Sequence, residues 1–119
     1  MNLNSILIGS EDPQRLADYY TKLFGEPSWN QGGYIGWLVG SGALTVGPHD
    51  QVQGKNAHPG RVIWNIESAD VKADFERFVA AGATVVREPY GPEQDETGEG
   101  LIATLSDPDG NYFQLMSPM

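Results

Sequence analysis

The 119-residue sequence contains no cysteine and only two histidines, His49 and His58. Without cysteine there is no disulfide framework, no thiolate metal site and no cysteine nucleophile. The two histidines lie in a polar stretch, residues 49–60. Three interpretations of them are open: exposed loop residues, a pair that chelates a metal ion, or a general base if the loop folds over a site. The sequence also lacks a nucleophile motif, a phosphate-binding glycine loop and a dinucleotide fingerprint.

Basic residues are scarce. Seven Lys and Arg stand against sixteen Asp and Glu, which gives a formal net charge of -9 and a pI of about 4.4. The basic residues are scattered along the chain rather than arranged in a stripe, so we expect no nucleic acid partner. The acidity either favours a cationic ligand or serves solubility alone.

Long apolar runs are missing as well. The opening, MNLNSILIGSEDP, has too short an apolar run for a signal peptide and no basic region before it. No segment reaches the length of a membrane-spanning helix. We therefore expect a cytoplasmic protein without a membrane partner. The length and the hydrophobic content of 39% fit one domain with its own core.

The first half of the chain reads as strand, helix and strands. Leu3 to Ile8 is a strand candidate, and Asp12 and Pro13 have the residue types of a helix N-cap and first turn. The apolar residues of this helix recur at helical spacing and end before Gly25: Leu16, Tyr19, Tyr20 and Leu23. Glycine turns then separate two further strands, Tyr34 to Val39 and Ala43 to Val46.

The second half repeats this order. A strand from Arg61 to Ile66 precedes a helix capped by Ser68 or Asp70 and closed by Gly82. The apolar residues of this helix are Val71, Phe75, Phe78 and Val79. A strand from Ala83 to Arg87, an acidic loop from Glu88 to Glu99 and a hairpin follow. The hairpin turn is predicted at Ser106–Asn111, because Pro108 presets its φ and Gly110 tolerates positive φ.

The two halves can be overlaid. An offset of 56 residues places Ser5–Ile8 on Arg61–Trp64, and a second overlay places Leu44–Val46 on Phe113–Leu115. A duplicated βαβββ unit explains both overlays. The predicted fold class is α+β, in one domain of two modules, about 1–57 and 58–119.

Three segments carry a resemblance to a known family: LNSILIGSEDPQRLADYYTKLFG, RVIWNIESADVKADFERFVAAGA and LSDPDGNYFQLMSP. With them the chain resembles the vicinal oxygen chelate superfamily, which includes glyoxalase I, extradiol dioxygenases and bleomycin-resistance proteins. Glyoxalase-like proteins of actinobacteria look especially similar. The resemblance covers nearly the whole chain. It implies two paired modules that form a curved, cup-like mixed sheet with helices outside, and assembly as a homodimer.

The resemblance also implies where metal ligands would lie, on the first and last strands of each module. Those positions are Ser5, Thr45, Arg61 and Gln114. Ser5 and Thr45 are poor neutral ligands, and Arg61 is a permanent cation without a lone pair to give. We therefore predict no metal and no cofactor, and a cup that binds an anionic or carbonyl oxygen through Arg61 and Gln114.

Alternation along the strands divides the predicted faces. The helix-packed side is expected to contain Ile6, Ile8, Val62, Trp64, Ile66, Phe113 and Leu115, against Leu16, Tyr19, Leu23, Val71, Phe75 and Val79 of the helices. The cup side is expected to contain Ser5, Leu7, Thr45, Arg61, Ile63, Tyr112 and Gln114. The candidate ligand-binding residues are Ser5, Thr45, Arg61, Tyr112, Gln114 and Trp37.

Several of these residues also have structural interpretations. Arg61 either binds an anion, pairs with a carboxylate or faces solvent, and Gln114 either binds a ligand or bonds within its sheet. Trp37 and Tyr34 lie on opposite faces of one strand, so only one of them can face the cup. Trp29 either lines the mouth of the cup or packs against the protein.

The leading functional hypothesis is metal-independent binding of a small organic molecule, as in drug or metabolite sequestration by bleomycin-resistance-like proteins. One alternative is a glyoxalase-like lyase, isomerase or dioxygenase with an atypical site, so the sequence leaves open whether the protein is an enzyme. Another is a dimeric scaffold without small-molecule activity.

Overall fold

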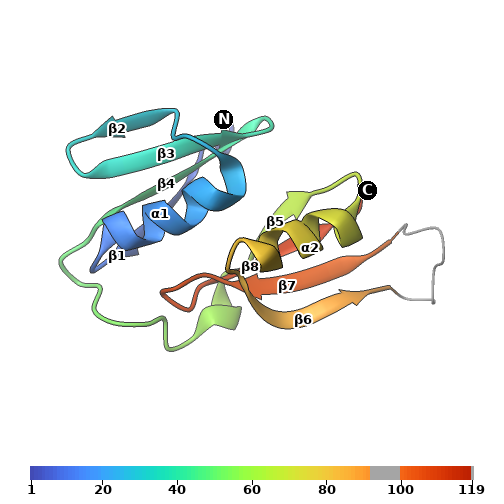
Figure 1. Cartoon of the computed structure of the whole chain (residues 1–119). Coiled ribbons are helices and arrows are strands. Elements are labelled where there is room, and N and C mark those ends of the chain that lie inside the picture. Colours follow the sequence, from blue (N-terminus) through green and yellow to red (C-terminus); the bar gives the residue numbers. More distant parts are fainter. Residues whose placement is uncertain (92–99, 119) are drawn as a thin grey trace. The chain divides into compact units, whose positions relative to one another are not determined.

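The computed structural model describes residues 1–91 and 100–118, and it divides into two units, Met1–Lys55 and Asn56–Met119. Each unit has the order strand, helix and three strands (Figure 1). The two predicted βαβββ modules and the α+β class are confirmed. No helix in the described ranges is long and apolar enough to cross a membrane.

Unit 1 contains one helix and a four-stranded mixed sheet with the order β1-β4-β3-β2. Its elements are β1 (Ile6–Ser10), α1 (Pro13–Phe24), β2 (Trp29–Gln31), β3 (Tyr34–Val39) and β4 (Gly42–Pro48). β1 pairs with β4 in parallel, and the other pairs are antiparallel. The helix carries the chain across the sheet between the parallel strands, which need such a crossover.

Unit 2 repeats this topology with the order β5-β8-β7-β6. Its elements are the short 3-10 helix η1 (Pro59–Arg61), β5 (Trp64–Glu67), α2 (Val71–Ala80), β6 (Thr84–Tyr90), β7 (Ile102–Ser106) and β8 (Tyr112–Met116). Again the first and last strands pair in parallel. The edge strand β6 has two register shifts, and residues 88–90 of the predicted acidic loop belong to it. Residues 92–99 of that loop lie outside the described residues.

Both helices begin with the same Ser-x-Asp arrangement. Ser10 Oγ accepts a hydrogen bond from the Asp12 amide (3.1 Å), and the Asp12 carboxylate caps the Arg15 amide (3.2 Å). In unit 2, Ser68 Oγ accepts from the Asp70 amide at 3.2 Å, and Asp70 accepts from the amide of Ala73 at 3.1 Å. An N-cap acceptor of this kind satisfies an amide that has no partner within the helix.

These caps correct the repeat offset. Ser10 and Ser68, like Asp12 and Asp70, are 58 residues apart (68 - 10 = 58). The ladders agree, because Leu7 pairs with Thr45 whereas Asn65 pairs with Gln114. The predicted offset of 56 is therefore wrong by two residues. A slip of two along a strand preserves the face of every side chain, but it matches each residue with the wrong partner.

The core of each unit lies between its helix and one face of its sheet. In unit 1 the Tyr20 and Trp37 rings lie 6.1 Å apart between α1 and β3, and both side chains are fully buried. In unit 2, Phe113 of β8 packs against Trp64 at 5.2 Å and Phe78 at 6.3 Å. The predicted helix-packed residues Trp64, Phe113 and Leu115 are buried as expected.

Some predicted core positions are wrong. Val62 is 71% exposed because the strand starts only at Trp64, and Val79 of α2 is 38% exposed. Arg61 to Ile63 are not part of the strand, since the chain forms η1 up to Arg61. Likewise β1 starts at Ile6, so the residues before it are not strand.

The predicted hairpin joins β7 and β8, and the Asp107 carboxylate organises its turn. Asp107 Oδ1 accepts hydrogen bonds from the amides of Asp109 (2.9 Å) and Asn111 (3.0 Å). The Asn111 side chain donates to the same carboxylate, and Gly110 has a φ of 81°. This turn sets the register that brings Gln114 of β8 beside Thr104 of β7.

Candidate ligand-binding faces

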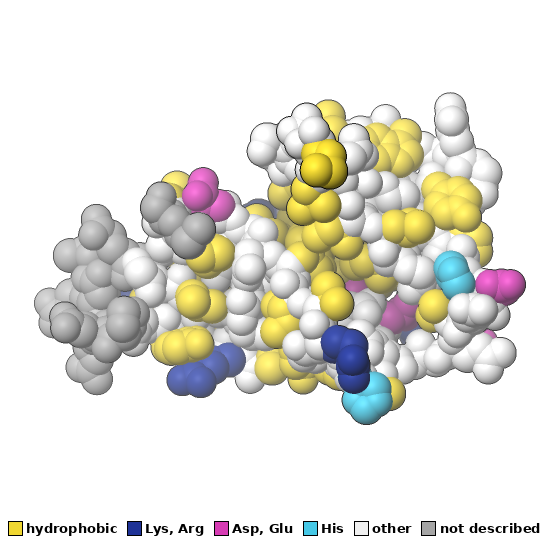
Figure 2. All heavy atoms as spheres, turned by 180° about the vertical axis from the view of Figure 1, so that it is seen from behind, with side chains coloured by type: hydrophobic (Ala, Val, Ile, Leu, Met, Phe, Trp, Pro, Cys, Tyr) yellow, Lys and Arg dark blue, Asp and Glu magenta, His cyan; other side chains and the backbone are white. Residues whose placement is uncertain are grey.

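In each unit, the helix covers one face of the sheet, and we call the opposite face the open face. The open face of unit 1 includes Leu7, Gly9, Trp29, Tyr34, Gly36, Leu38, Ala43, Thr45 and Gly47. The open face of unit 2 includes Asn65, Glu67, Arg87, Ile102, Thr104, Ser106, Tyr112, Gln114 and Met116. Hydrophobic side chains reach the surface on the side turned away from the viewer in Figure 1, as Figure 2 shows.

The open face of unit 2 carries a row of neutral polar side chains. Gln114 lies in the middle of β8, with Asn65 beside it on β5 and Thr104 beside it on β7. Gln114 Nε2 donates a hydrogen bond to Thr104 Oγ1 at 3.0 Å, which orients the amide. Thr104 is buried, Gln114 is half-buried and Asn65 is exposed. An amide offers two donors and one acceptor oxygen, so this bond uses only part of its capacity.

The open face of unit 1 is built differently, from rings placed over glycines. Trp29 of β2 lies opposite Gly36 of β3, and a Cβ added to Gly36 would collide with the indole. A Cβ on Gly47 would collide in the same way with the ring of Tyr34. Thr45 lies beside Gly36 in the ladder and two residues before Gly47. Only glycine lets a ring approach the backbone this closely.

None of the four strands of unit 1 contains a charged residue. Yet three large apolar residues on their open face are exposed: Leu7 (57%), Tyr34 (42%) and Leu38 (68%). An exposed sheet face normally carries polar and charged side chains. Exposed apolar surface of this kind is typical of interaction sites, so this face is a candidate binding site.

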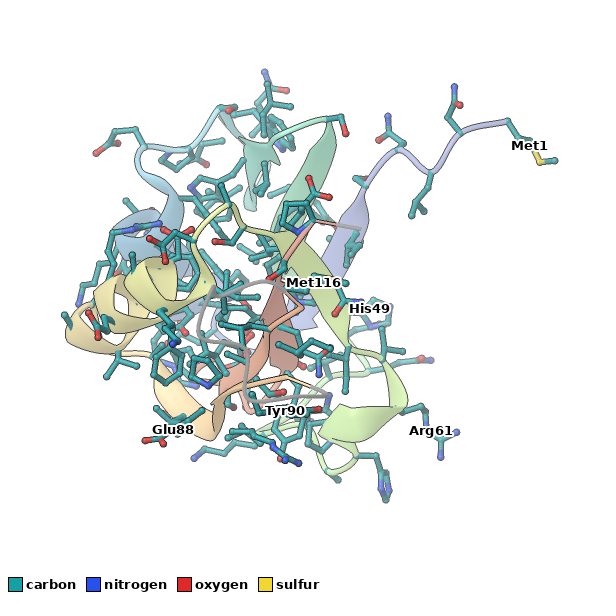
Figure 3. The ribbon with its side chains drawn as sticks, turned by 90° about the vertical axis from the view of Figure 1, so that its right-hand side faces the viewer. Met1, His49, Arg61, Glu88, Tyr90 and Met116 are labelled. Carbon is teal, nitrogen blue, oxygen red and sulfur yellow. The ribbon has the colours of Figure 1, made fainter. Side chains whose placement is uncertain are left out.

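The structure places two of the six predicted site residues, Thr45 and Gln114, at the centres of the open faces, one in each unit. Tyr112 begins β8 on the same face as Gln114 and is half-buried. Ser5 precedes β1 and is exposed. Arg61 ends η1, and its side chain projects away from the ribbon (Figure 3). The structure therefore does not bring Arg61 into the Gln114 row.

Trp37 does not lie on the open face of unit 1. It is 1% exposed, and its indole Nε1 donates a hydrogen bond to the Gly25 carbonyl at 2.9 Å, where α1 ends. The prediction that Trp37 lines the cup is thus wrong, and Tyr34 occupies the opposite face of that strand. The strand is apolar on both sides, so its residue types alone did not distinguish the faces.

Sequence reasoning missed Asn65 and Thr104 and left Trp29 ambiguous. Asn65 was missed because the offset of 56 matched the strands two residues out of register. Thr104 was missed because its role depends on a cross-strand pair. The signal for Trp29 was Gly36, a glycine inside an otherwise apolar strand. An isolated glycine in a strand often marks a place where another group approaches the backbone closely.

These residues do not fit a divalent metal. In unit 1, Thr45 and its ladder partner Leu7 offer a hydroxyl and a hydrocarbon, and in unit 2, Gln114 and its ladder partner Asn65 offer two neutral amides. Protein sites for such ions use several carboxylate, imidazole or thiolate ligands. In residues 1–91 and 100–118 there is no group of three or more His, Cys, Asp or Glu placed to hold an ion.

The duplicated βαβββ fold agrees with the resemblance to the vicinal oxygen chelate superfamily. A family model described as a glyoxalase-like domain matches residues 5–116, and the chain belongs to that family. A comparison with curated protein sequences finds no match.

Solved structures share the fold at low identity. The chain superposes on TioX from Micromonospora sp. ML1 with a TM-score of 0.75, 18% identity and 100% coverage of both chains. A glyoxalase-related enzyme from Fulvimarina pelagi gives 0.74 and 22%, covering 99% of this chain and 88% of the other. TnmS3, an antibiotic binding protein from Streptomyces sp. CB03234, gives 0.70 and 21%, covering 100% and 97%. These likenesses are of fold.

Proposed function

We propose that this protein binds a small organic molecule on the open faces of its sheets without a metal ion, as a drug- or metabolite-sequestering protein. The observation that carries the proposal is the oriented amide of Gln114, held by Thr104 at 3.0 Å on a half-buried surface between Tyr112 and Met116. Small-molecule sites contain a few precisely placed polar groups that fix the orientation of the ligand. TnmS3, which shares the fold, is an antibiotic binding protein.

The polar row favours a ligand with carbonyl, hydroxyl or amide groups. The Gln114 and Asn65 amides both donate and accept, and they pair well with such groups. The predicted anion reader, Arg61, lies on η1 rather than in this row. The net charge of -9 also disfavours an anion. Arg87 pairs with Thr104 on this open face, and its guanidinium carbon lies 3.7 Å from the centroid of the Tyr90 ring, so its charge already contacts an aromatic face. We therefore propose a neutral ligand in place of the anionic one.

We propose further that the protein is a cytoplasmic homodimer. Each four-stranded sheet leaves two edge strands, β1 and β2 in unit 1 and β5 and β6 in unit 2. Exposed edges are commonly covered by another chain. Light scattering above ten micromolar tests the homodimer, and a monomer mass of 12.9 kDa would contradict it.

A ligand screen by thermal shift tests the binding function, because a ligand that binds only the folded state raises the unfolding temperature. Each hit is then measured by calorimetry on Gln114→Ala and on Gln14→Ala, the matched control, since Gln14 is an exposed residue of α1 bonded to Asp18. We expect Gln114→Ala to weaken the hit roughly five- to tenfold, the value of about one hydrogen bond. The proposal fails if no compound shifts the transition or if both variants bind like the wild type.

A further inference from the structure

Trp29 and Tyr34 each lie over a glycine of the neighbouring strand. Trp29 leans from β2 onto β3 at Gly36, and Tyr34 leans from β3 onto β4 at Gly47. The three atoms nearest to a Cβ on Gly36 are the adjoining Cε2, Cζ2 and Nε1 of the indole. Both rings therefore lean in the same direction, from an outer strand onto the next strand inward. We call this surface the ring floor (Trp29, Tyr34, Gly36 and Gly47).

We infer that the ring floor stacks a planar aromatic ring system that carries no negative charge. The inference rests on the proposed function and names the class of ligand. Two aromatic rings on one sheet face offer stacking contacts that are worth more than their buried area alone. The four strands of unit 1 supply no cation to pair with an anion.

The glycines are positioning residues in this floor. Any side chain at Gly36 or Gly47 would occupy the space of the ring and push it off the backbone. Gly9 continues the pattern next to Gly47, where a Cβ would meet His49 Cβ at 3.0 Å. Glycine at positions 36 and 47 therefore lets both rings lie over the backbone of the sheet. Aromatic rings prefer other aromatic rings as stacking partners, so an aromatic molecule is the better occupant.

Thr45 gives the floor a half-buried polar group. Its side chain lies on the same face, next to Gly36 across the ladder, and is half-buried. A hydroxyl donates and accepts, so it recognises a ring nitrogen, a carbonyl or a phenol at the edge of the stacked system. One polar group among aromatic rings fixes the orientation of a ligand that stacking alone leaves free to rotate.

Two glycine substitutions test the floor. Gly36→Ala and Gly47→Ala each displace one ring, whereas Gly42→Ala is the matched control on β4, where the added Cβ meets only the Val39 carbonyl oxygen at 3.7 Å. The probes are 9-aminoacridine, a planar amine, and 1-aminoadamantane, a non-planar amine. Calorimetry should give equal dissociation constants for 9-aminoacridine, within about twofold, for the wild type and Gly42→Ala. We expect a loss of at least about tenfold for the other two variants.

Trp29→Ala and Trp29→Phe provide a second reading if the alanine variants fold poorly. Trp29→Ala should lose 9-aminoacridine binding, and Trp29→Phe should retain it within about threefold, because phenylalanine restores an aromatic face. The inference is overturned if 9-aminoacridine does not bind the wild type, or if 1-aminoadamantane binds as tightly. It is also overturned if Gly36→Ala changes the mass in solution, because a second copy would then cover this face. If hits from the ligand screen depend on Gln114 while Gly36→Ala leaves 9-aminoacridine binding unchanged, the ring floor is overturned and the proposed function stays intact.

Discussion

The turn at Asp107 offers the sharpest test of how the hairpin is held. In Asp107→Ala, the amides of Asp109 and Asn111 lose their acceptor, and Asp109 is only 5% exposed. A buried donor without a partner costs about 1–3 kcal/mol, and water reaches the half-buried Asn111 more easily. We therefore expect a loss of about 3 kcal/mol in the free energy of unfolding.

Urea denaturation measures this loss. With an m-value of about 2 kcal/mol/M, the midpoint should fall by roughly 1.5 M. Asp107→Asn keeps one acceptor oxygen but turns a donor toward the Asn111 side chain, so we expect a smaller loss of about 1–2 kcal/mol. The control is Asp50→Ala, because the Asp50 side chain is 95% exposed. Equal midpoints for Asp107→Ala and Asp50→Ala would refute the assigned role of this carboxylate.

Four further substitutions test the packing and the caps by the same assay. Trp64→Ala should cost about 3–5 kcal/mol, because the ring packs on the core side of β5 against β8, and an unchanged midpoint would contradict this placement. Val46→Ala, at a fully buried position, should lower the free energy of unfolding by about 2 kcal/mol. Val62→Ala, at a position 71% exposed, should lower it by less than about 0.5 kcal/mol. Equal losses for the two variants would show that β5 does not start at Trp64. Asp70→Ala should cost about 1 kcal/mol through loss of the α2 cap, and no loss would mean that Ser68 caps alone.

The sequence was sufficient to predict the duplicated order of elements, the helix caps and the hairpin. These features depend on local chemistry: a short polar side chain before a helical pattern, and a run of turn formers between two apolar strands. Asp12 and Asp70 do cap the helices as their residue types predict. The position of Gln114 on the open face followed from simple alternation along β8.

The sequence did not predict which residues pair between neighbouring strands or at which residue each strand starts. Arg61 belongs to a 3-10 turn rather than to β5, since Pro59 and Gly60 favour a turn as much as an extended start. The offset between modules was wrong by two because alternation repeats every two residues, so a slip of two leaves the pattern unchanged. The three-residue strand β2 is too short to show a period at all. The ring floor depends on such pairings, and only the ladders show which glycine lies under which ring.

The central claim, binding without a metal ion, is tested most directly by titrating one ligand from the thermal-shift screen into protein stripped with EDTA. The protein is purified without a histidine tag, and its metal content is measured before and after stripping. We predict less than about 0.1 metal ion per chain, since Leu7 and Thr45 of unit 1 and Asn65 and Gln114 of unit 2 offer no charged or imidazole ligand. The dissociation constant of the ligand should stay within about twofold after stripping and after addition of Zn²⁺, Ni²⁺, Mn²⁺ or Fe²⁺. About one ion per chain, lost in Gln114→Ala, or binding that returns only with the metal, would contradict the account.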